Sequence, residues 1–136
     1  THEKGLDEWV YFTGFQFGDE LLEILSTADI AVAPDPKSPF NDVSTMNKVI
    51  EFMAMGLPVV SFDLKETRYS AGEAAVYAPP NDEREFARCI IELLDDPDRR
   101  RRMGEYGLQR VREHLAWEHS RKVLIQLYTE LLCESK

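Results

Sequence analysis

The 136-residue sequence has few of the residues that build metal sites or covalent cross-links. It contains two cysteines, Cys89 and Cys133, and three histidines. Both cysteines fall within helical patterns and lack CxxC spacing, so we expect reduced thiols that are buried or half-buried. His114 and His119 do not have the i, i+4 spacing that places two ligands on one helix face. We therefore expect no metal site.

Long hydrophobic runs and an excess of basic residues are also missing. No apolar run approaches the roughly 20 residues that span a bilayer, and the N-terminal THEKGLDEW lacks the apolar core of a signal peptide. The net charge of -9 argues against general nucleic-acid binding, because neutralising phosphates requires a basic surface. These absences favour a cytoplasmic protein that binds no nucleic acid.

The composition that remains is that of one folded domain. The sequence is 43% hydrophobic and 30% charged, which favours a folded chain over disorder. Its length suits a single core. The one basic cluster, DRRRRMG, begins at Asp98 and is open to two interpretations: a contact with anionic lipid, or a solvated helix face.

The first half of the sequence alternates between short strand-like runs and amphipathic helices. A helix is predicted for DELLEILSTA, which starts at Asp19. The runs that predict strands are Trp9 to Phe15, Asp29 to Pro34, Leu57 to Asp63 and Glu73 to Pro80. The second of them, DIAVAP, has the compact apolar pattern of a strand that is buried on both faces.

The remaining sequence predicts helices with recognisable starts. Ser44 or Thr45 can cap a helix that runs to about Met55, and Gly56 can end it. A capping box of Asp82 and Glu85 opens the next long helix. Two more helices are expected, one with Asp96 and Pro97 at its start and one that begins at Trp117, which we expect to anchor in the core.

This alternation predicts an α/β fold with a Rossmann-like parallel sheet flanked by helices and followed by a helical C-terminal segment. In such sheets ligands bind outside the carboxyl ends of the strands. The loops after Phe12, Ala33 and Phe62 are therefore the candidate ligand-binding loops.

The helix that follows the Ala33 loop has the chemistry of an anion site. Its first N–H groups lack intrahelical partners, and Ser44 and Thr45 add hydroxyl donors. Lys48 could neutralise a phosphate while Glu51 accepts hydrogen bonds from sugar hydroxyls. The spacing allows another interpretation, in which Lys48 and Glu51 form an ordinary surface ion pair and Ser44 is only a cap.

Several segments resemble retaining, nucleotide-sugar-dependent glycosyltransferases of family four, which have the GT-B fold of two Rossmann-like domains. VIEFMAMGLPVVSFD is similar to the family's E-[AYF]-M-A-x-G-x-P-V-V segment. VYFTGF, LLEILSTADIAVAP and ELLDDPDRRRRMGEYG resemble three further family segments, in the family's order. LAWEHSRKVLIQLY resembles its final helix. The resemblance extends along nearly the whole chain.

The resemblance implies a donor-binding C-terminal domain and assigns roles by motif position. Glu51 matches the glutamate that hydrogen-bonds the ribose of the nucleotide. The backbone amides of Ser44 and Thr45 would hold the diphosphate. The residues expected against the nucleobase are Gly14, Phe15 and Gln16.

The family's E-x7-E pattern has an earlier glutamate that contacts the donor sugar, and Val43 stands at that spacing. STMNKVIE instead resembles a subgroup with K-x-x-E, in which Lys48 and Glu51 are the matching residues. There the loop would read the sugar, with Asn41 and Asp42 as candidates.

The resemblance also predicts what residues 1–136 do as a unit. They would form a single, partial nucleotide-sugar-binding domain, the truncated C-terminal half of a GT-B enzyme without its acceptor domain. The enzyme would transfer a hexosyl unit from a UDP-, GDP- or similar nucleotide sugar to a glycan or lipid-linked acceptor, without another cofactor. The resemblance allows a peripheral membrane contact of the full-length enzyme. It assigns no catalytic side chain. The isolated chain is expected to be inactive. The alternative is a non-catalytic nucleotide-binding or interaction module, or one subunit of a split transferase.

Overall fold

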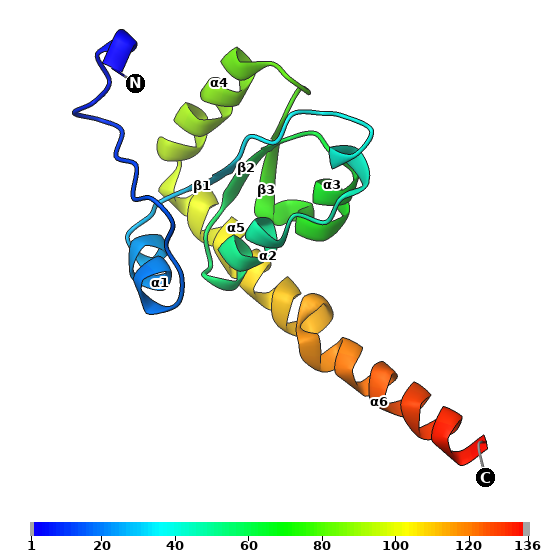
Figure 1. The fold of residues 1–136 in the computed structure, drawn as a ribbon. Coiled ribbons are helices and arrows are strands. Elements are labelled where there is room, and N and C mark those ends of the chain that lie inside the picture. Colours follow the sequence, from blue (N-terminus) through cyan, green and yellow to red (C-terminus); the bar gives the residue numbers. More distant parts are fainter. Residues whose placement is uncertain (1, 135–136) are drawn as a thin grey trace.

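A computed structural model describes residues 2–134 and shows a three-stranded parallel sheet (Figure 1). Its strands are β1 (Ala31–Ala33), β2 (Val59–Phe62) and β3 (Ala75–Ala78), in the order β1-β2-β3. Val59 of β2 pairs with Ala31 on one side and Ala75 on the other. The predicted α/β fold with a parallel sheet is confirmed.

Helices cover both faces of the sheet. On one face, α2 (Asn47–Ala54) inserts Val49 and Met53 into a core with Val59, and α3 (Lys65–Ala71) packs beside it. On the other face, α4 (Glu83–Leu94) packs Phe86 against Phe62. Helix α5 (Pro97–Arg110) contacts both α2 and α4, so it joins the two layers. All four residues of β2 are buried, because β2 lies between two strands and under two helical layers.

The predicted N-caps of α4 and α5 are confirmed, but the capping box of Asp82 and Glu85 is only half formed, because the Glu85 carboxylate binds Arg88 and the Asp82 amide donates to the carbonyl of Pro79. The Asp82 carboxylate accepts hydrogen bonds from the amides of Arg84 and Glu85, both at 3.1 Å. The Asp96 carboxylate accepts one from the amide of Arg99 at 2.8 Å, and a proline begins α5. These bonds satisfy amide groups that have no partner inside the helix.

The prediction that Ser44 or Thr45 caps α2 is wrong. Residues Asn41–Val43 form a separate 3-10 turn, η2, and α2 begins only at Asn47. The Ser44 hydroxyl donates to the carbonyl of Phe40 at 2.7 Å, and the Thr45 hydroxyl donates to the Glu66 carboxylate at 2.8 Å. Because both hydroxyls are engaged elsewhere, neither reaches the first amides of α2. At the other end of this helix, Gly56 adopts the expected left-handed conformation, with φ of 72°.

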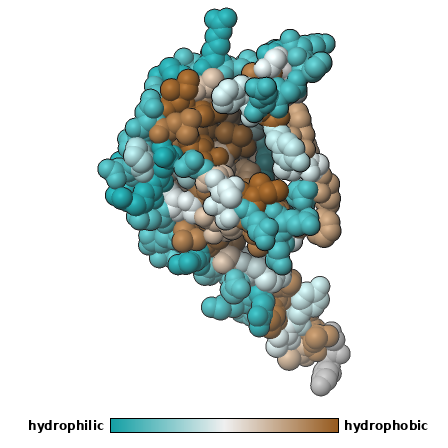
Figure 2. Space-filling model, turned by 90° about the vertical axis from the view of Figure 1, so that its left-hand side faces the viewer, coloured by the Kyte–Doolittle hydropathy of each residue, from teal (hydrophilic) through white to brown (hydrophobic). Residues whose placement is uncertain are grey.

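The strand predicted for Trp9 to Phe15 is absent. After a short 3-10 turn, η1 (His2–Lys4), the chain is irregular up to α1 (Asp19–Ser26), and its aromatic side chains are exposed. A strand needs a hydrogen-bonded neighbour, and among residues 2–134 this segment has none. Figure 2 looks onto this side of the molecule and shows hydrophobic surface gathered there.

The prediction that β1 is buried on both faces is also wrong. Val32 is 42% exposed, because α4 covers β2 and β3 and leaves the outer strand open on that side. The outer edge of β1 pairs with no strand in the described part of the chain. The described sheet is therefore open along β1.

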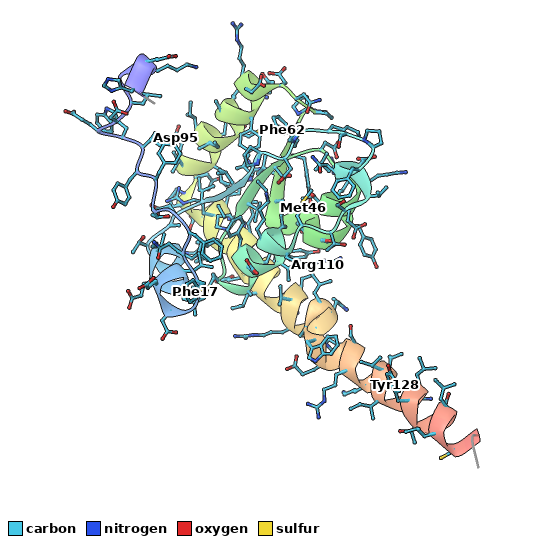
Figure 3. All side chains as sticks on the ribbon, in the orientation of Figure 1. Phe17, Met46, Phe62, Asp95, Arg110 and Tyr128 are labelled. Carbon is cyan, nitrogen blue, oxygen red and sulfur yellow. The ribbon has the colours of Figure 1, made fainter. Side chains whose placement is uncertain are left out.

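The C-terminal helix α6 (Trp117–Glu134) projects away from the rest of the molecule (Figure 1). A π-helical turn, η4 (Val111–Leu115), connects it to α5. Its apolar side chains are exposed, including Tyr128, which stands on the projecting helix in Figure 3. Trp117 is 62% exposed, so the expected core anchor is wrong. Across residues 2–134, no helix is both long and apolar enough to cross a membrane.

Candidate functional site

The loops that leave the carboxyl ends of β1 and β2 meet through charged side chains. The Asp42 carboxylate accepts a hydrogen bond from the backbone amide of Lys65 at 3.0 Å, and the Lys37 ammonium lies 3.4 Å from the same oxygen. The bond from the Lys65 amide holds the pKa of Asp42 below its usual value of 3.8. The Lys37 ammonium also donates to the carbonyl of Asp63 at 3.4 Å. Asp42 thus joins the loop after β1 to the start of α3.

Asn41 and Ser38 stabilise the same loop. The Asn41 side-chain amide donates to the carbonyl of Pro36 at 2.8 Å, and its backbone amide donates to the Ser38 hydroxyl at 3.1 Å. Asn41 and Asp42 therefore lie in the loop at the carboxyl edge of the sheet. Both already make hydrogen bonds to the protein.

An arginine-centred cluster lies at the end of β2. The Arg68 guanidinium donates to Asp63 at 2.8 Å and lies 4.2 Å from the centre of the Tyr77 ring. This hydrogen bond lowers the pKa of Asp63, while burial raises that of Tyr77 to about 12. The cluster fixes α3 beside the strand ends.

Lys48 does not form the ion pair with Glu51 that its spacing allows. Its ammonium lies 2.7 Å from the carboxylate of Asp35, in the loop that follows β1. The second oxygen of that carboxylate is buried without a hydrogen-bond partner in the described part of the chain. The ion-pair interpretation of Lys48 and Glu51 is therefore wrong, and Lys48 is held toward the strand-end loop.

The side chain of Glu51 is exposed, and its carboxylate has no hydrogen-bond or ion-pair partner among residues 2–134. It borders a hollow of about 290 Å³ between α1 and α2. The remaining lining residues are mainly apolar: Gly18, Leu21, Leu22, Leu25, Ala54 and Met55. This arrangement places one unpaired carboxylate beside an apolar wall.

Unpaired backbone donors lie at the start of α2, one turn before Glu51. The amides of Thr45, Met46, Asn47 and Lys48 donate to no acceptor in the described residues. The amide of Ser44, in contrast, donates to the carbonyl of Asn41 at 3.4 Å. Of the two residues whose amides the sequence indicated, Thr45 thus has an unpaired amide and Ser44 does not.

The three residues predicted against a nucleobase lie in the irregular segment before α1. Gly14 has a φ of 72°, and the side chain of Phe15 is 89% exposed. The Gln16 side-chain amide donates to the carbonyl of Thr13 at 2.8 Å. This turn leads into Gly18, which borders the same hollow as Glu51.

Val43 is 69% exposed and offers no polar group where the family pattern has a glutamate. Sequence reasoning missed Asp35 and Lys37, both of which interact with residues of the candidate site. Their signal was their position directly after the carboxyl end of β1. In the described part of the chain, no group of three His, Cys, Asp or Glu side chains could hold a metal ion.

Comparison with known proteins gives consistent matches. Residues 1–96 match the family described as "Glycosyl transferases group 1". The chain is 28% identical over 133 residues to a D-inositol 3-phosphate glycosyltransferase of Corynebacterium urealyticum, with 96% of this chain and 30% of the relative covered. It is also 28% identical to a lipopolysaccharide core biosynthesis glycosyltransferase of Rhizobium meliloti, which it covers to 36%.

One solved structure resembles nearly the whole chain. Sucrose-phosphate synthase from Thermosynechococcus elongatus superposes with a TM-score of 0.76 at 27% identity, covering 98% of this chain and 33% of that one. The chain thus spans about a third of the length of each of these relatives.

Proposed function

Because the chain belongs to the group 1 glycosyl transferase family, we propose that it is the nucleotide-sugar-binding part of a retaining glycosyltransferase. The transferred group would be a hexosyl unit, and the acceptor a glycan or a lipid-linked acceptor. Residues 1–136 would act as a single, partial donor-binding domain, with the acceptor domain outside them. The name of the lipopolysaccharide core biosynthesis glycosyltransferase supports such an acceptor, whereas the inositol phosphate in the name of the other relative lies outside this range.

The unpaired carboxylate of Glu51 carries this proposal. Lys48 is bound to Asp35, so Glu51 keeps its full capacity to accept hydrogen bonds. A ribose offers adjacent hydroxyl donors, and hydrogen bonds to a charged acceptor are stronger than neutral ones. The apolar wall of the hollow suits the flat face of a base, which would lie near Gly14, Phe15 and Gln16.

The start of α2 supports a diphosphate next to this ribose. Its unpaired amides from Thr45 to Lys48 point out of the positive end of the helix dipole. The Lys48 ammonium lies one turn from Glu51 and could move from Asp35 to a phosphate oxygen. Ser44 would contribute less than the resemblance implied, because its amide and hydroxyl already have partners.

The sugar would be read by the loop after β1. Val43 cannot accept hydrogen bonds through its side chain, so Asn41 and Asp42 remain the candidates at this edge. Because both already bind the protein, we propose that their main contribution is to hold the loop in shape. Backbone groups of that loop would then contact the sugar.

Calorimetric or NMR titration with UDP, GDP and the corresponding nucleosides tests the proposal. Glu51→Ala should weaken nucleotide and nucleoside binding alike, by about tenfold, because the ribose is common to both. Lys48→Ala should weaken only the nucleotide. Glu73→Ala, which removes another exposed carboxylate, serves as the matched control. Unchanged affinity in Glu51→Ala would overturn the ribose assignment.

The chain spans only about a third of its relatives, and this observation favours a second candidate function. A chain covering 30% of a family member could act as a nucleotide-binding module or as one subunit of a split transferase. On both proposals the 136-residue chain alone should bind nucleotide without transferring sugar. Sugar transfer by the purified chain would contradict that expectation.

A further inference from the structure

A second hollow lies on the opposite face of the sheet from α2, at the same carboxyl edge. It has a volume of about 350 Å³ and is lined by Pro34, Pro36, Phe62, Asn81, Glu83 and Phe86. These residues come from the loop after β1, from the end of β2, from the turn before α4 and from the start of α4. The hollow therefore lies where ligands of doubly wound sheets bind, but outside the set of residues assigned to the nucleotide.

The turn between β3 and α4 holds this hollow open. Asn81 has a left-handed backbone with φ of 60°, and its side-chain oxygen accepts a hydrogen bond from the amide of Lys37 at 2.7 Å. The side-chain nitrogen donates to the carbonyl of the same lysine at 3.5 Å. This pair of bonds ties the loop after β1 to the start of α4. The two walls of the hollow are thus connected before any ligand arrives.

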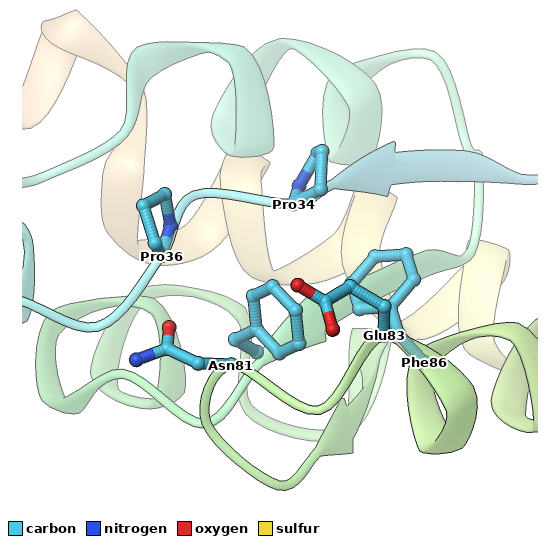
Figure 4. Close-up of a pocket in the computed structure, with 6 residues that line it drawn as sticks. Pro34, Pro36, Asn81, Glu83 and Phe86 are labelled. Atoms are coloured by element: carbon cyan, nitrogen blue, oxygen red, sulfur yellow. The ribbon is translucent and has the colours of Figure 1, made fainter.

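The chemistry of the lining is that of an apolar surface with one acceptor. The Phe62 and Phe86 rings lie 4.9 Å apart and are almost fully buried, so they form a fixed floor. The Glu83 carboxylate is directed toward the middle of the lining residues (Figure 4) and has no hydrogen-bond or ion-pair partner among residues 2–134. It does not cap α4 either, because Asp82 does so.

This lining discriminates between ligand classes. The Glu83 carboxylate repels phosphate, so this position favours a neutral ligand over a nucleotide. It accepts hydrogen bonds from hydroxyl groups, while the floor and the two prolines can cover the C–H face of a ring. The ligand that combines these properties is a neutral, hydroxylated ring such as a hexose or a cyclitol.

The loop that forms one wall also connects this hollow with the proposed donor site. Pro34 and Pro36 face the hollow, whereas Asp35 between them binds Lys48 on the other face of the sheet. A ring in the hollow would thus lie across one loop from the diphosphate position. We propose that the hollow is a subsite that contacts a neutral sugar or cyclitol ring of the acceptor, in addition to the contacts made by the acceptor domain outside residues 1–136, with Glu83 as the residue that binds its hydroxyls; this deepens the proposed transferase function and rests on it.

A titration of the isotope-labelled 136-residue protein with methyl α-mannopyranoside and with myo-inositol, followed by amide NMR shifts, tests the subsite. At least one of the two should shift amides of residues 34–37 and 81–86. Glu83→Ala should weaken this binding by about tenfold or more, and Glu83→Gln should weaken it less, because the shape of the side chain is kept. Glu85→Ala is the matched control. It removes an acidic residue from the same helical turn, and the Glu85 carboxylate is bound to Arg88.

A UDP titration of the same samples separates the two proposals. If UDP shifts residues around Glu51 while neither ring compound perturbs the hollow, the subsite is wrong and the nucleotide site stands. If a ring compound binds in the hollow and UDP binds nowhere, the transferase assignment fails while binding at Glu83 is retained. Equal ring affinity in Glu83→Ala and Glu85→Ala would overturn the role of Glu83.

Discussion

At the scale of single residues, two carboxylates near the carboxyl edge of the sheet, Asp42 and Glu51, acquire different roles from their neighbours. Asp42 is bound by a backbone amide and an ammonium, so it stabilises a loop. Glu51 lies on a helix whose one nearby cation is bound to Asp35, so it stays available. Spacing along the sequence could not separate these cases, because Lys48 had an equally good partner within one helical turn.

Gly104 of α5 packs against the turn that ends α2, with no room for a side chain. A Cβ atom added to Gly104 of α5 would lie 2.1 Å from the carbonyl oxygen of Gly56, in the turn that ends α2. We expect Gly104→Ala to lower the free energy of unfolding by about 1 to 3 kcal/mol, because backbone rather than a flexible side chain must move. Urea denaturation checks this.

Glu105→Ala on the same helix is the control, since Glu105 is exposed. It should change the free energy of unfolding little. A Gly104→Ala variant as stable as the original protein would show that α5 and α2 are less tightly packed than the contact implies.

At the scale of elements, the sequence correctly predicted the helix starts and the strand that depend on nearby residues. Asp82 and Asp96 start their helices as expected, because the capping bond involves residues at most three positions away. The β2 strand was recognisable because all its residues are apolar or small. The start of α2 was not, since the hydroxyls of Ser44 and Thr45 bind Phe40 and Glu66 and only the fold reveals these contacts.

The candidate site divides in the same way. Glu51 and the strand-end loops could be named from motif and topology, whereas the Asp35 to Lys48 ion pair and the Glu83 hollow depend on tertiary placement. The segment from Trp9 to Phe15 has strand-like residues but no neighbouring strand in the described chain. Residues with a preference for strands form a strand only where a neighbouring strand supplies hydrogen-bond partners.

Helix α3 should make stability depend on pH in the acid range. The Arg68 hydrogen bond holds the pKa of Asp63 below its ordinary value of 3.8. Because the folded pKa is depressed, this pair contributes stability that is fully present above that ordinary value and is lost as pH falls through the folded value. Asp63→Asn should therefore destabilise the protein by about 1 kcal/mol or less at neutral pH, since the pair is exposed.

The measurement is denaturant unfolding of both proteins from pH 7 down to acid. The difference between them should shrink as pH falls below the ordinary value, where the carboxylate of the unfolded chain begins to be protonated. It should be smallest below the folded pKa, where the carboxylate of the folded protein is protonated too. Asp95→Asn, which removes an exposed carboxylate without a described ion-pair partner, should change stability little. A difference that stays constant down to the lowest pH would mean that the Asp63 charge contributes nothing.

At the scale of the whole molecule, apolar surface is unevenly distributed. The body from β1 to α5 has its cores on both faces of the sheet. The surface outside those cores includes exposed apolar side chains on α6, the exposed Val32 at the open edge of β1, and the aromatic side chains before α1. Surfaces of this kind on soluble proteins usually mark places where another polypeptide packs.

We therefore expect the 136-residue protein to self-associate as its concentration rises, mainly through α6. In α6 the apolar residues, among them Leu124 and Leu131, occupy a wide arc and are exposed along the length of the helix. Sedimentation velocity should show a concentration-dependent increase in average mass. Removal of residues 117–136 should abolish most of this increase and leave the thermal midpoint nearly unchanged, because α6 makes few contacts with the body.

If the shortened chain associates as before, the open edge of β1 is the contact. Val32→Lys should then reduce association, because charged side chains on an edge strand oppose strand pairing. A large fall in the thermal midpoint on removal of α6 would instead show that this helix stabilises the body through contacts that its exposed side chains do not indicate.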